Sequence, residues 1–404
     1  MPSYRSVGLV PPRRHTRSGA FAPDAQPLLP WFEELIGSEG FAGASSLAYH
    51  RRSPSALVSI EAMAHDPDGD GPALRANHPL RPVHLQTSAL VCGAEPVLGR
   101  VCLAGNAHVR LAWWSGGPTT SPLTRDAAGD EVLYVQSGTV RLETTFGALE
   151  LGGGDVCVVP AATPHRFVAT VAASLFIIEA AGGHIEIPHR YLSRNGQMLE
   201  GSPYNERAVR TPAVPLLAED LGIDPDAPVD VVVRTRAGAT VHRHASHPFD
   251  VIGWDGCLAP WAVSVDDIEP VVGRTHQPPP VHQLLSGPRF VVCAFVPRPL
   301  DWGEGAVAVP YHHANVDSDE VLLYSRGHFT SRVGTTIDAG SITVHPAGFT
   351  HGPQPGAREA SEAASHTQEV AIMVDTFDPL GFTPAALAID DDDYWRSWNT
   401  GAAR

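Results

Sequence analysis

A two-part pattern occurs twice along this chain, and it limits the fold more than any other feature of the sequence. Its first part is a Glu, six residues and a Gly, found as EVLYVQSG at 131–138 and as EVLLYSRG at 320–327. Its second part is a Gly, five residues, a Pro, four residues and a His, found at 154–165 and at 340–351. Two copies in the same order indicate two copies of one structural unit.

The segments around both copies are short apolar and β-branched runs separated by Gly, Pro and Asp, which is typical of strands joined by turns. Gly and Pro account for 38 and 37 of the 404 residues, so long helices are disfavoured. We therefore expect an all-β fold of two barrel or sandwich units, with short helices near residues 30 and 215 and at the C-terminus. The expected strand segments are 131–151, 155–170, 173–180, 230–235, 289–296, 320–333, 341–348 and 369–377.

An acidic, Pro-rich stretch around 205–230 separates the two copies. We place the boundary there, with an N-terminal extension and the first unit in residues 1–215 and the second unit in residues 216–404. The first copy keeps Glu131 and His165, but it has TRDAAGDE where the second copy has histidines before its Glu. We expect the first unit to be degenerate and to serve packing.

The charge balance disfavours polyanionic partners. The chain has 28 Lys and Arg residues and 44 Asp and Glu residues, which give a formal net charge of −16. We therefore expect neither nucleic acid nor a membrane as a partner. We find no apolar run long enough to span a membrane and no apolar core of a signal peptide. The five cysteines are widely spaced without a CxxC pair, which predicts buried thiols in a cytoplasmic protein.

The second copy carries the residue types of a metal site. His313 and Asn315 are two residues apart, so on a strand both would face one barrel interior. Glu320 begins the next strand, and His351 closes the second part of the pattern. Two imidazoles and one carboxylate that converge at a barrel mouth form the facial triad that suits a non-haem Fe(II) with open coordination positions.

The two-part pattern resembles the cupin superfamily. A longer set of segments, HPFDVIGWDG, HQPPPVHQ, FVPRPLDW, PYHHANVDSDE, RGHF and GSITVHPAGFTHGPQPG, is similar to the homogentisate 1,2-dioxygenase family. The similarity is sharpest over 242–356. It implies two cupin-type (jelly-roll) β-barrels and an Fe(II)-dependent enzyme of tyrosine and phenylalanine catabolism that converts homogentisate and O2 to maleylacetoacetate. It also implies a homo-oligomer whose other partners are a small aromatic substrate and O2.

Residue by residue, the resemblance implies that the iron ligands are His313, Glu320 and His351. His276 matches a histidine on a loop over the metal that acts as an acid or base, or hydrogen-bonds the bound phenol. His345 matches a histidine that contacts the substrate. Asn315 stands where a typical cupin has another metal histidine, and this family also carries Asn there, beside the substrate.

The chain departs from the family at two positions. Six residues separate His313 from Glu320 where the family has five, so Asp319 competes as the carboxylate ligand. The six-residue spacing from Glu320 to Gly327 favours Glu320 because it preserves the hairpin register. After RGH the family has a Tyr that helps to hold the substrate carboxylate, whereas this chain has Phe329 at the substrate site.

The loss of that hydroxyl leaves the substrate open, because a site built to hydrogen-bond a group discriminates strongly on that group. One alternative is the same chemistry on a related hydroquinone or phenolic acid. Another is a non-catalytic bicupin that binds a small ligand. Arg274 and Arg326 are the candidate cations for an acidic arm of the substrate, and the sequence does not decide between them.

Overall fold

The computed structural model describes residues 3–12, 31–63, 73–235, 237–273, 282–301, 303–305 and 309–399. These residues are mostly β-structure, and the predicted all-β class is confirmed. The α-helices within the described residues are α1 (Ala357–Ser361) and α2 (Pro384–Leu387). Short 3-10 turns are η2 (Glu39–Phe41), η3 (Thr87–Ala89), η4 (His189–Tyr191), η5 (Ala218–Leu221), η6 (Val265–Asp267), η8 (Thr330–Arg332) and η9 (Tyr394–Arg396).

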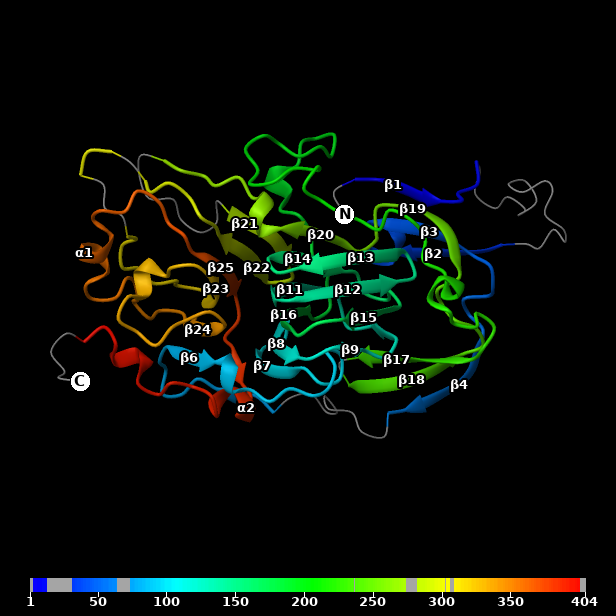
Figure 1. Ribbon diagram of the computed structural model, residues 1–404, viewed down its shortest axis with the longest axis horizontal. Helices are drawn as coiled ribbons and strands as arrows, with labels where there is room; N and C mark the ends of the chain where they lie inside the picture. The colour runs from blue at the N-terminus through cyan, green and yellow to red at the C-terminus, as the bar shows by residue number, and fades with distance from the viewer. Residues whose placement is uncertain are drawn as a thin grey trace.

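Two eight-stranded sheets form an N-terminal barrel at the centre of the molecule (Figure 1). The first sheet runs β13 (Gly147–Gly152), β12 (Thr139–Thr144), β15 (His165–Ala169), β10 (Thr124–Asp126), β17 (Val229–Thr235), β18 (Gly238–His244) and β4 (Leu57–Ala62), with β9 (Thr119–Thr120) beside β15. The second runs β20 (Trp261–Ser264), β14 (Asp155–Val159), β11 (Glu131–Ser137), β16 (Ala173–Ala180), β8 (Val109–Gly116), β7 (Val101–Gly105), β26 (Gly381–Phe382) and β5 (Arg75–Ala76).

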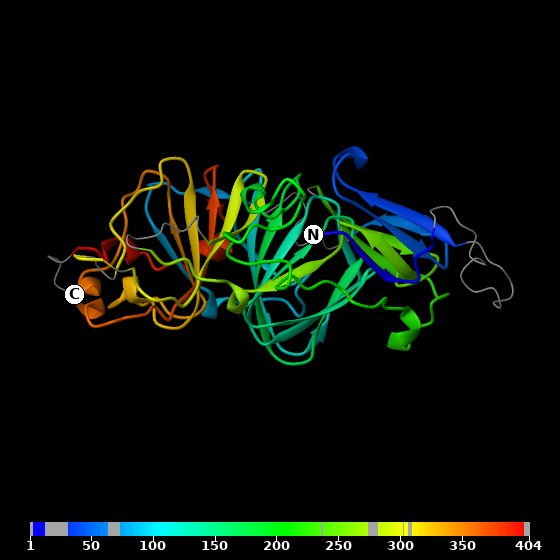
Figure 2. The ribbon, with the colours of Figure 1, turned by 90° about the horizontal axis from the view of Figure 1, so that it is seen from above.

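Two smaller sheets flank this barrel on opposite sides, as Figures 1 and 2 show. The C-terminal unit is built on a six-stranded sheet with the order β21 (Gln283–Gly287), β22 (Phe290–Phe295), β25 (Val370–Thr376), β23 (Asp319–Arg326), β24 (Ser341–His345) and β6 (Val83–Gln86). The other end carries a four-stranded sheet with the order β1 (Arg5–Gly8), β19 (Val251–Gly256), β3 (Ser45–His50) and β2 (Phe32–Gly37).

Sheets are shared across the predicted boundary after residue 215. Strands β17, β18 and β20 follow that residue, yet they belong to the two sheets of the N-terminal barrel. Strand β6 precedes it, yet it pairs with β24 in the C-terminal sheet. The division into 1–215 and 216–404 stays a prediction, and in space each unit takes strands from both sides of it.

Alternation along the central strands divides the side chains between two environments. One face of β11 and of β23 packs in the core between the two units, with the side chains of Val132, Tyr134, Val321 and Leu323. The other face of β23 turns into the C-terminal unit with Glu320, Leu322 and Tyr324, which line a cavity there. Glu320 therefore faces the cavity, because the apolar residues of the opposite face of the strand pack in the core.

The backbone conformation requires a glycine at the end of the first part of the repeat, for the same reason in both copies. Gly138 and Gly327 have φ angles of 78° and 91°, in the left-handed region that favours glycine. A Cβ atom at these positions would collide with the backbone carbonyl oxygen of Ala172 or of Gln368, respectively. The pattern thus marks a tight turn pressed against the start of a neighbouring strand.

The helix predicted near residue 30 is wrong, because Phe32–Gly37 is strand β2 and pairs with β3 along its whole length. Tertiary pairing outweighs the weak helical periodicity of this segment. The helices predicted near 215 and at the C-terminus are single 3-10 turns, η5 and η9. The strand predicted over 320–333 ends at Arg326, and the turn η8 follows.

Candidate metal centre

His313, Glu320 and His351 come together at one end of the C-terminal sheet. Glu320 is the second residue of β23, and His313 forms an isolated antiparallel bridge with His351. The Nε2 atom of His351 lies 3.2 Å from Oε1 of Glu320, and that of His313 lies 3.6 Å from Oε2. Within the described residues, these three are the group of His, Cys, Asp or Glu side chains that could hold a metal ion, with all ligand atoms within 4.8 Å of one another.

Both imidazoles are oriented for coordination through Nε2. Nδ1 of His313 lies 3.2 Å from the carbonyl oxygen of Tyr311, and Nδ1 of His351 lies 3.1 Å from that of Phe349. A carbonyl only accepts, so Nδ1 donates to it in both rings, and Nε2, which faces Glu320, is the atom that can bind a metal ion once its own proton is released. Two such nitrogens and one carboxylate on the same side are the donor set of a non-haem Fe(II) site, so these residues fit that metal.

Glu320 is held in its charged form. Burial alone would raise the pKa of this carboxyl, but the adjacent imidazoles of His313, His345 and His351 hold its pKa well below the usual value. The side chain of Asn315 adds a further donor, with Nδ2 lying 3.4 Å from Oε2. An ionised carboxylate is the state that a divalent cation needs as a ligand.

His345 lies behind Glu320 rather than among the described residues that line the cavity. Its Nδ1 is 3.1 Å from Oε1 of Glu320, and its Nε2 is 3.0 Å from the hydroxyl of Tyr394. Burial lowers the pKa of His345 to about 3, so the ring is neutral. Nδ1 therefore donates to Glu320, and Nε2 accepts from Tyr394. The contact of His345 with a substrate stays a prediction, while these two bonds make it a positioning residue for Glu320.

The alternative carboxylate, Asp319, points away from the cluster. Its Oδ1 accepts from the N–H of Ala347 at 2.9 Å, and its Oδ2 accepts from the N–H of Leu380 at 2.8 Å. Both oxygens are thus engaged in fixing loops at the strand end. Glu320 is the carboxylate that the structure brings to the two histidines.

A cavity of about 330 Å³ opens beside the triad. Apolar side chains from three strands line much of it, namely Phe295, Leu322 and Met373. His313 and Asn315 both line it, although they lie on an irregular segment with the isolated bridge at His313 and not on the strand that the sequence predicted. Its polar wall also contains Tyr324, Arg332 and Asp375. Such a mostly apolar hollow with a few fixed polar groups is typical of a small-molecule site.

Asp375 is a second carboxylate on this wall. It lies on β25 directly opposite Glu320 in the strand register. Its Oδ1 is buried without a hydrogen bond to any described residue. Burial and the neighbouring Glu320 raise the pKa of Asp375 to about 7.

The remaining predicted residues lie elsewhere. Phe329 is outside the described cavity lining and packs edge-to-face on Tyr324, with ring centroids 5.0 Å apart. Arg326 forms an exposed ion pair with Asp266. His276 and Arg274 lie outside the described residues.

The N-terminal barrel contains the same arrangement with different chemistry. Thr124 pairs with His165 as His313 pairs with His351, and Glu131 pairs with Glu179 as Glu320 pairs with Asp375. Thr124 also precedes Glu131 by the spacing that separates His313 from Glu320. The N-terminal counterparts of His313, Glu320, His351 and Asp375 are therefore Thr124, Glu131, His165 and Glu179.

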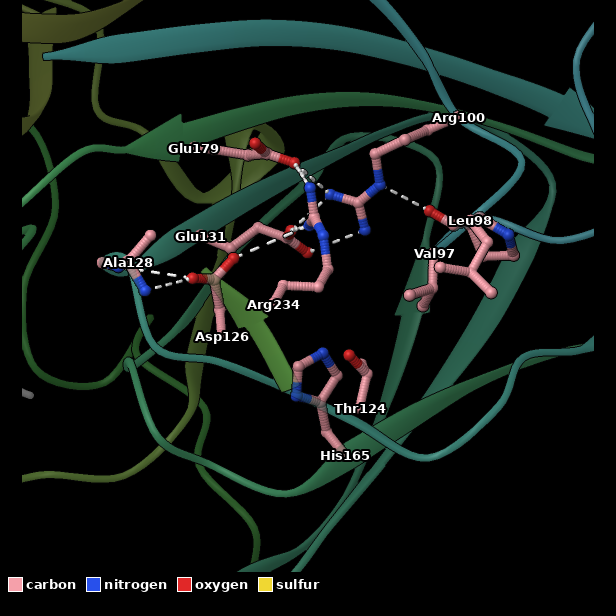
Figure 3. A network of polar contacts seen from close by, with 12 residues as sticks. Val97, Leu98, Arg100, Thr124, Asp126, Ala128, Glu131, His165, Glu179 and Arg234 are labelled. Carbon is pink, nitrogen blue, oxygen red and sulfur yellow. Dashed lines mark hydrogen bonds and ion pairs between the residues drawn. The ribbon is translucent and has the colours of Figure 1, made fainter. Parts of the chain in front are cut away.

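Two arginines fill the centre of this N-terminal site (Figure 3). Arg100 donates from Nη1 to Glu131 and, at 2.8 Å, to Glu179. Arg234 donates to Glu179 at 2.8 Å and lies 3.6 Å from Glu131 and from Asp126. Against the effect of burial, the two guanidinium groups lower the pKa of Glu179 to about 2. Guanidinium groups thus supply the positive charge that a metal ion would bring.

Sequence reasoning missed four residues around the C-terminal site, namely Tyr324, Arg332, Asp375 and Tyr394. The signal for Asp375 is a single acidic residue inside the apolar run EVAIMVDTF. Tyr394 lies in DDDYWRSW, which the sequence predicts only as a terminal helix. No spacing pattern links Tyr324 or Arg332 to the triad.

Comparison with known proteins places the chain in a family. It is 36% identical over 400 residues to a protein of Saccharolobus solfataricus named "Putative dioxygenase", covering 98% of this chain and 99% of that one. The family model described as "Homogentisate 1,2-dioxygenase N-terminal" matches residues 98–265. The chain belongs to the homogentisate 1,2-dioxygenase family.

More distant members of this family are longer than the present chain. Homogentisate 1,2-dioxygenase of Nitrobacter hamburgensis is 28% identical over 293 residues, which cover 67% of this chain and 61% of that protein. Among solved structures, a cupin 2 conserved barrel domain protein of Leptotrichia buccalis matches 73% of this chain and 96% of its own at 11% identity, with a TM-score of 0.34. No helix in the described part of the chain is long and apolar enough to span a membrane.

Proposed function

We propose that this protein is an Fe(II)-dependent dioxygenase that opens the ring of a hydroquinone acid, with homogentisate as the first candidate. The observation that carries the proposal is the triad of His313, Glu320 and His351, with both imidazole Nε2 atoms oriented toward one carboxylate. The adjoining cavity of about 330 Å³ gives an aromatic ring room beside it. The names of the family relatives support the same class of reaction.

Fe(II) held by the triad would supply adjacent open positions for O2 and a phenolic oxygen, and electrons for activating O2. The chain's own groups prepare the site. Glu320 stays ionised beside its histidine neighbours, and the Tyr394–His345 pair holds it in place from behind. The apolar wall, including Leu322 and Met373, excludes water from the reacting ring.

The chemistry needs no external reductant. Homogentisate and one O2 give maleylacetoacetate with both oxygen atoms retained in the product, so the ring itself is oxidised. An acid or base must move the phenolic proton, and His276 is assigned to this role from the resemblance alone. An imidazole with an ordinary pKa suits that task near neutral pH.

The test is anaerobic loading with Fe(II), followed by O2 uptake and the absorbance of the enol product on addition of homogentisate. We expect one O2 consumed per product formed. His313→Ala is expected to abolish turnover, while His312→Ala is the matched control, because His312 is exposed and lies in a separate hollow beside Trp398. Full turnover in His313→Ala would show that the ligand assignment is wrong.

Two other functions make different predictions. If a related hydroquinone or phenolic acid is the substrate, O2 uptake is faster with gentisate-like acids than with homogentisate. If the protein is a ligand-binding bicupin without catalysis, careful purification yields no iron and no acid stimulates O2 uptake. Phe329 in place of the family Tyr is the residue that motivates the first alternative.

We also propose a cytoplasmic location and a homo-oligomeric state. All five cysteines are free thiols, and two of them, Cys157 and Cys293, are buried, which supports a reducing compartment. The oligomeric state rests on the family resemblance, and light scattering of the purified protein measures it. A monomer at working concentration would contradict this part of the proposal.

A further inference from the structure

The cavity beside the triad contains a buried cation that no described carboxylate binds. Arg332 is 7% exposed and lines the cavity. Its Nε donates to the hydroxyl of Tyr324 at 2.6 Å, and its Nη1 donates to the carbonyl oxygen of Gly352 at 2.7 Å. Both partners are neutral, and Nη2 makes no hydrogen bond to a described residue.

The hydrogen bonds of Arg332 fix it relative to the triad. Gly352 directly follows His351, so the guanidinium is attached to the backbone next to a proposed ligand. Tyr324 lies on the same face of β23 as Glu320, four residues along the strand. The cation and the metal-binding groups therefore stand on one wall with little freedom to move apart.

A buried charge without a counter-ion is costly, and the chain offers little compensation for Arg332. Two acidic side chains on the cavity wall interact with it electrostatically, and neither forms a hydrogen bond or ion pair with it: Glu320 is engaged by the histidines, and the pKa of Glu369 is raised by burial, so its charged form is disfavoured. A carboxylate from a ligand would complete the hydrogen bonds of the guanidinium in the geometry that Arg prefers.

We propose that Arg332, held by Tyr324, binds the carboxylate of an aromatic acid whose ring lies over the triad. This deepens the proposed function, on which it rests, by naming what recognises the acidic arm. Phe329 lacks the hydroxyl that the family places there, but its ring touches the ring of Tyr324 at 5.0 Å. In this chain the phenol beside Phe329 is that of Tyr324, and it orients an arginine.

Two other arginines compete for this role. Arg298 also lines the cavity, but it is only half-buried and no described side chain fixes its guanidinium. Arg326 is paired with Asp266 at the surface, away from the cavity lining. The rigid, buried Arg332 is the one whose charge the fold leaves for a ligand.

The test compares the binding of phenylacetate with that of its neutral analogue 2-phenylethanol, by isothermal titration calorimetry of the full chain. Neither ligand is turned over, so the result does not depend on catalysis. A charge-assisted pair predicts that the wild type binds the acid about 10- to 100-fold more tightly than the alcohol. Arg332→Gln is expected to bring this ratio near one, and the control Arg326→Gln is expected to keep it.

Several outcomes overturn the proposal: no preference for the acid in the wild type, an unchanged ratio in Arg332→Gln, or loss of the ratio in Arg298→Gln alone. If thermal melting shows that Arg332→Gln does not fold, Arg332→Lys carries the test. An ammonium cannot make the bidentate pair, so the ratio should fall several-fold, and a wild-type ratio contradicts the proposal. If the protein prefers the acid but shows no O2 uptake, the carboxylate site at Arg332 is supported and the proposed dioxygenase reaction is contradicted.

Discussion

Replacement of Tyr394 by Phe tests how the candidate metal centre is supported. The hydroxyl of Tyr394 is buried and lies 3.0 Å from Nε2 of His345, which donates through Nδ1 to Glu320. Tyr394→Phe leaves that Nε2 buried without a donor, a loss of about 1–3 kcal/mol in the free energy of unfolding. Because His345 orients a proposed ligand, we also expect Fe(II) affinity to fall about 10- to 100-fold.

The assay for Tyr394→Phe is Fe(II) affinity, measured anaerobically against a competing chelator, together with urea unfolding of the metal-free protein. The matched control is Tyr204→Phe, because the hydroxyl of Tyr204 is equally buried and donates to the carbonyl oxygen of Leu284 at 2.7 Å, in the core between the units. Both variants should lose similar stability, and only Tyr394→Phe should lose iron affinity. Equal iron affinity in the two variants would refute the positioning role of His345.

Three further predictions concern the rest of the molecule. Arg234→Met should lower the free energy of unfolding in urea by about 3–5 kcal/mol, because it leaves buried carboxylates without one of their cations. The control Arg289→Met removes an exposed ion pair and should change stability little, and equal effects of the two variants would contradict this prediction. Since arginines already neutralise the N-terminal site, metal analysis should find one iron per chain, and two would refute that assignment. His50 lies between Asp250 and Glu34, and its pKa is raised to about 9. Its charged form therefore stabilises the protein by about 3 kcal/mol below pH 6.5, and this stabilisation is lost as the pH rises through 9. His50→Gln should destabilise the protein at pH 6 but hardly at pH 10, and a pH-independent loss of stability would contradict this prediction.

Local spacing is the reason why much of the site could be predicted from the sequence. The interval from Glu320 to Gly327 sets a hairpin whose glycine needs a positive φ angle, and the interval from Gly340 to His351 brings a histidine back across it. Strand alternation then turns Glu320 inward, and the isolated bridge between His313 and His351 brings the two histidines to it. The choice between Glu320 and Asp319 follows from the same alternation, and the sequence alone favoured Glu320 without excluding Asp319.

The remaining features depend on contacts between distant segments, which spacing does not encode. Tyr394 reaches His345 from the far C-terminal turn, and Arg100, just before β7, and Arg234, on β17, meet their carboxylates from distant parts of the chain. The segment of strand β2 has a helical periodicity in sequence, and its extended conformation depends on pairing with β3. In each case a long-range partner determines the conformation or the role, so a single local window carries no signal for it.

The most direct test of the central claim is the position of bound iron. Crystals of the Fe(II)-loaded protein, measured at the iron absorption edge, give an anomalous peak wherever iron binds. We expect one peak per chain, between Nε2 of His313, Nε2 of His351 and the carboxylate of Glu320, facing the cavity lined by Arg332. A peak elsewhere, or no peak at this triad in protein that retains iron, would contradict it.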